Sequence, residues 1–431
     1  MMKRYWLESY GCQMNMAESN ALQTRLEAAG LVAADSLEAS DIAIINTCSV
    51  RKSAEDRIWG RLGYFDHVKK TNKDLKIVVT GCMAQRLLDD LKKECPQVDY
   101  VVPVNDKGKI VDIATGGILD HNSEYRFDEC SYKDGEISSF VPIMNGCDNF
   151  CTYCIVPYVR GREVSRSVAD ILKEVRFLDG KGVREITLLG QNVNSYKSQD
   201  VLFPRLLSEI AKECHSIRWI RFDSPHPKDF SDALIDVIAR ESRVAKHIHI
   251  PLQSGSTRIL SLMNRKYTKE QFLRLIGTMR ERIPDITFAV DVMVGFPTET
   301  EEDFRETLDV LSIMRASEPF MYYYNEREGT RAVSMDGKID EDTKSHRLSD
   351  LIAFQTDIVR SEKRKRIGSV AEALVAQVSK QDQGMMLCHT EHNEMVVVPT
   401  DKPAGSLFTV RLTGLKGNTF SGEEVRDGRV Q

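Results

Sequence analysis

Short apolar runs alternate with amphipathic stretches through residues 1–102, the pattern of strands that are each followed by a helix. The expected strands are Trp6–Tyr10, Asp41–Asn46, Lys76–Thr80 and Tyr100–Val102. The expected helices are Met16–Ala29, Ser53–Lys69 and Ala84–Lys93. Because right-handed crossovers place successive strands parallel in one sheet, we predict an N-terminal parallel βα sheet domain over residues 1–120.

The same alternation continues over residues 140–325. The expected strands are Val141–Met144, Glu185–Leu189, Trp219–Phe222, His247–Leu252, Thr287–Val294 and Phe320–Tyr324. The expected helices are Val168–Asp179, Pro204–Glu213, Ser231–Arg240, Lys269–Arg282 and Glu301–Arg315. Thr268 with Gln271, and Thr300 with Asp303, fit the capping-box pattern of helix starts. This α/β pattern predicts a partial (β/α)6 barrel, whose site would lie at the carboxyl ends of its strands.

A long polar helix is expected at residues 340–366, and it ends in the basic run Arg360–Arg366. Such a run belongs either to a solvated face or to a nucleic-acid contact. The pattern then changes to short strands separated by turns. The expected strands are Ala371–Ser379, Met385–His389, Met395–Pro399 and Leu407–Leu412. We predict a core domain at residues 133–366 and a small antiparallel β-barrel at residues 367–431.

Composition narrows the class of protein. Of the 431 residues, 42% are hydrophobic and 29% are charged, which is typical of a globular chain. No apolar run is long enough for a membrane helix, and no apolar leader follows Met1, so we expect a cytoplasmic protein with no membrane partner. The net charge of −5 means that a nucleic acid would need a local positive patch.

The cysteines carry the candidate chemistry. Cys147, Cys151 and Cys154 form a C-x3-C-x2-C triplet with no fourth ligand close by; the next histidine is His215. A structural zinc site has four ligands, whereas three thiolates can hold three irons of a 4Fe–4S cluster and leave the fourth open to a cofactor. The alternatives are a zinc knuckle and a chance grouping of buried cysteines.

A second set follows the first three strands. Cys12, Cys48 and Cys82 each come directly after a strand, and the carboxyl ends of parallel strands share one edge of a sheet. We therefore expect the three thiols to converge on an Fe–S or zinc site. The alternative is that each cysteine is only a small residue in a tight strand–helix turn.

Polar residues and glycine follow the strands of the predicted barrel as well. The candidates for cofactor binding are Gln191, Ser224, Gln253 and Gly295. Each of them could equally serve only to turn the chain.

Longer motifs extend these observations. They are Ser9–Asn15, Asn46–Arg51, Asn149–Arg162, Leu189–Tyr196 and His249–Gly255. With them the chain resembles the radical S-adenosylmethionine (SAM) methylthiotransferases over essentially its whole length, and within that family the MiaB-type branch. One stretch departs from the family pattern Tyr-Ser-x-Arg-Pro-Gly-Thr: Asn325 and Glu328 replace its serine and proline, which leaves the shape of the substrate pocket open.

The resemblance implies a domain order of methylthiotransferase domain, radical SAM core and TRAM-like barrel. It implies that Cys147, Cys151 and Cys154 hold the 4Fe–4S cluster that binds SAM. The other trio would hold an auxiliary 4Fe–4S cluster that carries the transferred sulfur. One SAM would methylate the sulfur, and a second would generate the radical that activates carbon 2 of N(6)-isopentenyladenosine at position 37 of tRNA.

The implied partners are a tRNA anticodon stem-loop, an electron donor such as flavodoxin or ferredoxin, and a sulfur donor; we expect a monomer. Tyr322 and Tyr324, with Arg327, are candidates for stacking against the RNA, or else for ordinary packing. The rival functions are methylthiolation of threonylcarbamoyladenosine in tRNA, methylthiolation of a ribosomal-protein aspartate, and non-catalytic Fe–S carriage. The Gln191–Tyr196 block favours the isopentenyl branch.

Overall fold

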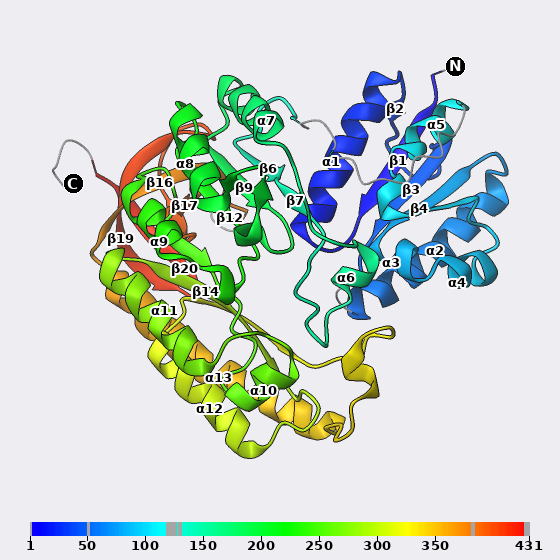
Figure 1. The fold of residues 1–431 in the computed structure, drawn as a ribbon. Coiled ribbons are helices and arrows are strands. Elements are labelled where there is room, and N and C mark those ends of the chain that lie inside the picture. The colour runs from blue at the N-terminus through cyan, green and yellow to red at the C-terminus, as the bar shows by residue number, and fades with distance from the viewer. Residues whose placement is uncertain (1, 50–51, 118–126, 128–131, 381–383, 426–431) are drawn as a thin grey trace. The chain divides into compact units, whose positions relative to one another are not determined.

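A computed structural model describes residues 2–49, 52–117, 127, 132–380 and 384–425 (Figure 1). Val50 and Arg51 of the second motif, and the expected domain ends at residues 120 and 431, lie outside these ranges. The chain divides into two compact units. The first comprises Met1–Asp134, Phe140–Phe150 and Cys154–Arg166, and the second comprises Gly135–Ser139, Cys151–Tyr153 and Ser167–Gln431.

The first unit contains the predicted parallel sheet, in the order β2-β1-β3-β4-β5. Its strands are β1 (Arg4–Ser9), β2 (Val32–Ala33), β3 (Ile42–Thr47), β4 (Lys76–Gly81) and β5 (Tyr100–Val102). All of their pairings are parallel, as predicted. Every residue of the central strand β3 is buried, because one apolar cluster packs on each face of the sheet.

Helices follow the strands as expected, with one correction. They are α1 (Gln13–Ala28), α2 (Lys52–Thr71), α3 (Cys82–Arg86), α4 (Leu88–Glu94) and α5 (Lys109–Thr115). The prediction of one continuous helix at Ala84–Lys93 is wrong. The chain breaks at Leu87, whose backbone angles of φ −109° and ψ 35° are not helical, and α3 already starts at Cys82.

The first unit also holds a loop that carries two of the triplet cysteines. Strand β7 (Met144–Asn145) pairs antiparallel with β8 (Val164–Ser165), and α6 (Val156–Val159) lies between them in the sequence. The expected strand Val141–Met144 is therefore wrong in its bounds, because β6 (Ser138–Pro142) ends before Ile143 and β7 belongs to a separate pair.

Two three-stranded sheets are ordered β12-β9-β6 and β13-β14-β15, and all of their strands except β6 belong wholly to the second unit. Their further strands are β9 (Glu185–Leu189), β12 (Trp219–Phe222), β13 (His247–His249), β14 (Thr287–Val294) and β15 (Glu318–Tyr323). β12 is parallel to β9, and β14 is parallel to both β13 and β15. A bridge between Ile220 and Val244 connects β12 to the chain just before β13. The six expected strands thus form an open, partial barrel.

The helices of this unit follow the predicted order. They are α7 (Val168–Gly180), α8 (Phe203–Glu213), α9 (Asp232–Arg240), α10 (Thr257–Leu262), α11 (Lys269–Arg282) and α12 (Glu301–Met314). Both predicted capping boxes are confirmed, Thr268 with Gln271 and Thr300 with Asp303. The short helix α10 was not predicted.

The expected long helix is α13 (Glu341–Arg366), and a closed barrel ordered β16-β17-β18-β20-β19 follows it. Its strands are β16 (Val370–Val378), β17 (Met386–Thr390), β18 (Met395–Val398), β19 (Leu407–Lys416) and β20 (Thr419–Glu424). Sequence patterning missed β20. The barrel packs on the core, because Leu374 contacts Trp219 and Ala245. The C-terminal barrel, residues 367–425, therefore belongs to the same compact unit as the core.

Within the described part of the chain, no helix combines the length and the apolar character that crossing a bilayer requires.

We predict that Phe420→Ala destabilises the C-terminal barrel by about 3–5 kcal/mol, the usual cost of truncating a buried phenylalanine. Phe420 is 1% exposed on the closing strand, where it lies opposite Val396. Hydrogen exchange over residues 370–425 measures the change. Val378→Ala, at a 63% exposed position, is the control and should change stability by less than about 0.5 kcal/mol. Unchanged exchange in Phe420→Ala would contradict the closing role of β20.

Candidate functional site

Cys12, Cys48 and Cys82 all lie at the carboxyl edge of the first unit's sheet. Thr47 of β3 lies opposite Gly81 of β4. Cys48 and Cys82 are the residues that come next on these two neighbouring strands. Gly11 has φ +110°, and a Cβ there would lie 2.3 Å from the Cβ of Cys48. The backbone at Gly11 therefore lies directly against the side chain of Cys48, and only glycine allows it. The shared edge was predicted; ligand binding by this trio stays a prediction.

Asn15 fixes the turn that carries Cys12. Its Nδ2 donates hydrogen bonds to the carbonyl oxygens of Tyr10 at 2.8 Å and of Thr47 at 2.9 Å. Its Oδ1 lies 3.9 Å from Cys12 Sγ. One side chain thus connects the ends of β1 and β3 to the thiol. Asn15 is fully buried, so these bonds are shielded from water.

A buried ionic cluster lies next to Asn15. Arg160 donates to Glu18 at 2.9 Å, to Asn145 Oδ1 at 2.9 Å and to Asn15 Oδ1 at 3.0 Å. Lys107 also forms an ion pair with Glu18. Burial alone would raise the pKa of Glu18, but Arg160 and Lys107 outweigh it and lower that pKa to about 2. Glu18 is therefore ionised.

The segment that follows Cys154 packs directly on Cys82. Ile155 and Val159 form an apolar cluster with Cys82 and Val104, so α6 lies against the start of α3 (Figure 1). Burial raises the pKa of the Cys82 thiol, and the nearby Arg160 charge partly offsets that rise. The loop of one cysteine set is thereby anchored beside a member of the other.

The triplet loop has its own backbone requirements. Cys147 N–H donates to the carbonyl of Gly161 at 3.2 Å, which closes the loop. Gly146 has φ +83°, and a Cβ there would lie 2.1 Å from the carbonyl oxygen of Arg162. Glycine is therefore required at this position. Cys147 and Cys151 are buried and Cys154 is half-buried.

Arg265 is a site residue that sequence reasoning missed. It is 4% exposed, its Nη1 lies 3.6 Å from Cys151 Sγ, and its Nη2 donates to the carbonyl of Pro251 at 3.0 Å. The guanidinium can donate a hydrogen bond to this sulfur, so Arg265 helps to fix the position of Cys151. Arg265 lies in the short link between α10 and α11, where no sequence pattern marked it.

The strand-end candidates share the carboxyl edge of the second unit's strands. Ser224 and Gln253 have φ values of +57° and +68°, a strained backbone for residues other than glycine. Gln191 and Gln253 are half-buried and Ser224 is exposed. A Cβ at Gly295 would lie 2.4 Å from Lys344 Cγ, so packing against α13 already accounts for this glycine.

His226, two residues after Ser224, was not selected from the sequence. It is 4% exposed, and its Nε2 has no hydrogen-bond partner within the described residues. Burial, reinforced by the charge of Arg265, lowers the pKa of His226 to about 2, so the ring is neutral. A neutral imidazole nitrogen without a partner at this edge is suited to accept a hydrogen bond from a ligand.

The three candidates for RNA stacking differ in their surroundings. Tyr324 is 2% exposed and packs in a core cluster with Phe296, which favours a packing role. Tyr322 is half-buried and donates to Asp291 Oδ1 at 3.1 Å. Arg327 is buried, and its carbonyl accepts a hydrogen bond from Thr330.

The donor chemistry of both trios fits an Fe–S cluster. Within the described ranges, no three His, Cys, Asp or Glu side chains are grouped as ligands of one ion. A cubane does not require such a group, because each cysteine binds a different iron. The ligand types present are soft thiolates, which iron–sulfur clusters and zinc both prefer.

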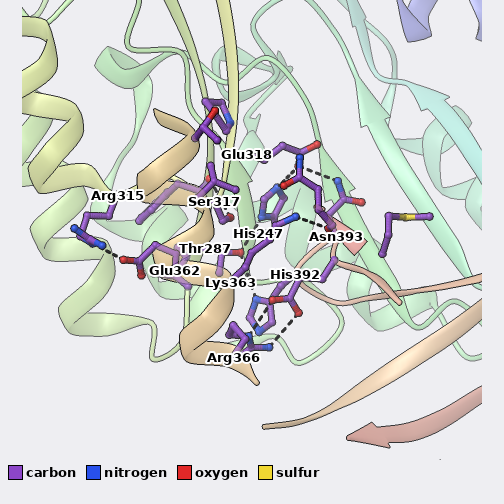
Figure 2. A pocket seen from close by; sticks show the side chains of 18 of the residues that line it. His247, Thr287, Arg315, Ser317, Glu318, Glu362, Lys363, Arg366, His392 and Asn393 are labelled. Carbon is purple, nitrogen blue, oxygen red and sulfur yellow. Dashed lines mark hydrogen bonds and ion pairs between the residues drawn. The ribbon is translucent and has the colours of Figure 1, made fainter. Parts of the chain in front are cut away.

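A cavity of about 490 Å³ lies elsewhere, at the amino ends of β13–β15 where α13 meets the C-terminal barrel (Figure 2). His247 contacts Thr287 Oγ1 at 2.8 Å and Glu318 at 3.1 Å, and Arg366 pairs with Glu394 at 3.0 Å. These polar and charged side chains pair with one another. The cavity is a polar junction between two elements of the fold, at the opposite end of the strands from the candidate site.

Family models match two regions of the chain. Residues 141–311 match the radical SAM superfamily, and residues 4–103 match the uncharacterized protein family UPF0004. Curated relatives match along nearly the whole length. A tRNA-2-methylthio-N(6)-dimethylallyladenosine synthase of Treponema denticola is 44% identical, over 96% of this chain and 98% of that protein. A protein of the same name from Bacteroides fragilis is 42% identical, over 98% and 96%.

Solved structures share the fold at low sequence identity. The radical S-adenosylmethionine methyltransferase TsrM from Kitasatospora setae has a TM-score of 0.55 at 15% identity, covering 75% of each chain. The cobalamin-dependent S-adenosylmethionine radical enzyme OxsB has a TM-score of 0.52 at 12% identity, covering 83% of this chain and 56% of that one.

We predict that Glu18→Gln lowers the free energy of unfolding by about 3 kcal/mol, because it leaves Arg160 and Lys107 buried without their carboxylate. The pKa of Glu18 falls from 4.5 to about 2 on folding, so its stabilisation is complete above pH 4.5 and is lost as the pH falls through 2. Denaturant unfolding of the metal-free protein across this range measures both effects.

The matched control is Glu213→Gln, which removes a more exposed partner of Arg176 and should lower the free energy of unfolding far less than Glu18→Gln does. Equal losses in the two variants would contradict a special role for the buried cluster.

Proposed function

Because the chain belongs to the radical SAM superfamily and, within it, to the family of tRNA-2-methylthio-N(6)-dimethylallyladenosine synthases, we propose that it methylthiolates carbon 2 of N(6)-isopentenyladenosine at position 37 of tRNA. The observation that carries this proposal is the full-length identity to relatives of that name. Both cysteine sets fall within this shared length.

The cofactors are SAM and two 4Fe–4S clusters. We assign Cys147, Cys151 and Cys154 to one cluster and the sheet-edge trio to the other. When bound, these groups supply radical chemistry at the first site and sulfur at the second. Such chemistry suits the substrate, because an aromatic C–H bond is too weakly acidic for a protein base to remove.

The chain's own residues prepare these sites. Arg265 places a guanidinium beside Cys151 Sγ, and Asn15 holds Cys12 against the ends of β1 and β3. Burial of Cys48, Cys82, Cys147 and Cys151 limits the access of water and oxidants. His226 offers a neutral nitrogen to a ligand that enters at the carboxyl edge of β12.

The tRNA substrate must present its base outside the stack, because chemistry at a ring carbon requires an exposed base. Tyr322 and Arg327 are the candidates for contacting it, and the packing of Tyr324 fits a supporting role better.

We further propose an electron donor such as flavodoxin or ferredoxin, a sulfur donor, a monomeric state and action in the cytoplasm, where tRNA is used. The proposed domains are residues 1–120, 133–366 and 367–431.

Mass analysis of tRNA nucleosides tests the proposal. Cells that lack the gene should lose the methylthio-isopentenyl nucleoside and retain the isopentenyl precursor. Loss of a methylthiolated threonylcarbamoyl nucleoside, or of a modified ribosomal aspartate, would assign the chain to a sister enzyme. Unchanged tRNA, together with no 5′-deoxyadenosine from reduced, loaded protein and SAM, would indicate a non-catalytic Fe–S carrier.

We predict that a Cys12/Cys48/Cys82→Ala triple variant keeps one cluster, still cleaves SAM and cannot thiolate RNA. The reason is that the two thiol sets serve separate clusters. Anaerobic reconstitution with iron and sulfide quantified, followed by product analysis, measures all three properties. Cys214→Ala removes a buried cysteine of neither set and should keep both clusters. A triple variant that loses SAM cleavage while remaining folded would argue against separate clusters.

A further inference from the structure

The ionic cluster beside the sheet-edge cysteines carries more positive than negative charge. Arg160 and Lys107 share the carboxylate of Glu18, and the side chains of the three are 2%, 8% and 3% exposed. Asn15 and Asn145, which also accept hydrogen bonds from Arg160, are neutral amides. An unbalanced buried charge is costly, so such a cluster calls for a neighbouring anion.

The arrangement places this excess charge next to two thiols. Arg160 Nη2 lies 3.0 Å from Asn15 Oδ1, the same oxygen that lies 3.9 Å from Cys12 Sγ. Val159, which directly precedes Arg160, packs on Cys82. The guanidinium is therefore held next to both Cys12 and Cys82 by hydrogen bonds and by packing.

The hydrogen-bond pattern requires an arginine. Three separate acceptors, on Glu18, Asn15 and Asn145, surround one guanidinium. A planar fork with five donors can serve them together, whereas an ammonium on a flexible stem supplies a point charge without that geometry. Arg160 therefore carries a charge and fixes its position.

We propose that Arg160 is a positioning residue of the auxiliary site: it balances the negative charge of a cluster held by Cys12, Cys48 and Cys82, and so makes that cluster easier to reduce. The inference depends on the proposed function for its assignment of the cluster to these cysteines. Three thiolates leave a 4Fe–4S cluster negative, and reduction adds further negative charge. Net charge and hydrogen bonding around a cluster set its reduction potential.

Variants of opposite charge should shift the reduction potential of the cluster in opposite directions, which a general loss of structure would not do. Removing the positive charge in Arg160→Gln should move the potential to more negative values. Removing the negative charge in Glu18→Gln should move it to more positive values. Arg160→Lys keeps the charge and should shift the potential less than Arg160→Gln does. General damage to the site would move the Gln variants in the same direction.

The test is an anaerobic redox titration, followed by electron paramagnetic resonance, of full-length protein whose Cys147, Cys151 and Cys154 are all replaced by alanine. Only the auxiliary cluster then contributes to the signal. At a fixed potential, Arg160→Gln should lower the ratio of reduced to oxidised cluster by about tenfold, the scale of one charge acting across a partly buried site. Arg176→Gln, which removes a more exposed arginine that pairs with Glu213, should leave the potential unchanged.

The outcomes separate the two proposals. Parent protein that binds no iron at this site would overturn both the auxiliary-cluster assignment and the inference. A loaded cluster whose potential is unchanged in Arg160→Gln and Glu18→Gln, or moves the same way in both, would overturn the inference alone. If Arg160→Gln does not fold, as judged by circular dichroism, Lys107→Gln replaces it. That variant must shift the potential to more negative values for the inference to stand.

Discussion

The buried ion pair between Glu18 and Arg160 is the interaction on which the first unit's site depends. Glu18 belongs to the helix that starts after Cys12, and Arg160 belongs to the segment that follows Cys154. The pair therefore joins two stretches of chain that are 142 residues apart. Because both side chains are almost fully buried, neither can be removed without leaving the other as an uncompensated charge. The contact constrains both stretches at once.

This constraint explains why the compact units do not follow the order of the sequence. Residues 154–166 carry a triplet cysteine, yet they pack with the N-terminal sheet through Ile155, Val159 and Arg160. Cys151 instead packs with the second unit, where Arg265 contacts it. The triplet cysteines thus belong to different units, Cys147 and Cys154 to the first and Cys151 to the second. Each unit also has a buried arginine beside a cysteine, Arg160 in the first and Arg265 in the second.

Much of the fold followed from sequence patterning because strand periodicity and cap chemistry are local. The parallel order of β1, β3, β4 and β5 and both capping boxes are confirmed. The missed strand β20 contains Ser421 and Gly422, which are residue types typical of turns. This strand is stabilised by its pairing in the closed barrel, which the sequence pattern does not show. The helical spacing of apolar residues did not predict the break at Leu87 either, because this spacing continues on both sides of the break. The family was identified from long motifs rather than from patterning.

The site was predictable only in part. The spacing of the cysteines and their positions after strands are visible in the sequence, so all six could be selected as candidate ligands. Arg160, Arg265 and His226 could not be assigned roles, because their function depends on burial and on partners distant in sequence, such as Glu18 and Cys151. Tyr324 shows the converse: a tyrosine at a strand end suggested RNA contact, and the structure places it in a core cluster with Phe296.

The central claim is that two separate cysteine trios each bind a 4Fe–4S cluster through three protein ligands. Anaerobic crystals of the reconstituted protein, measured at the iron absorption edge, test it most directly. We expect two distinct anomalous peaks, one bounded by the sulfurs of Cys12, Cys48 and Cys82 and the other by those of Cys147, Cys151 and Cys154. A single peak, or a fourth protein side chain closing either cluster, would contradict the account.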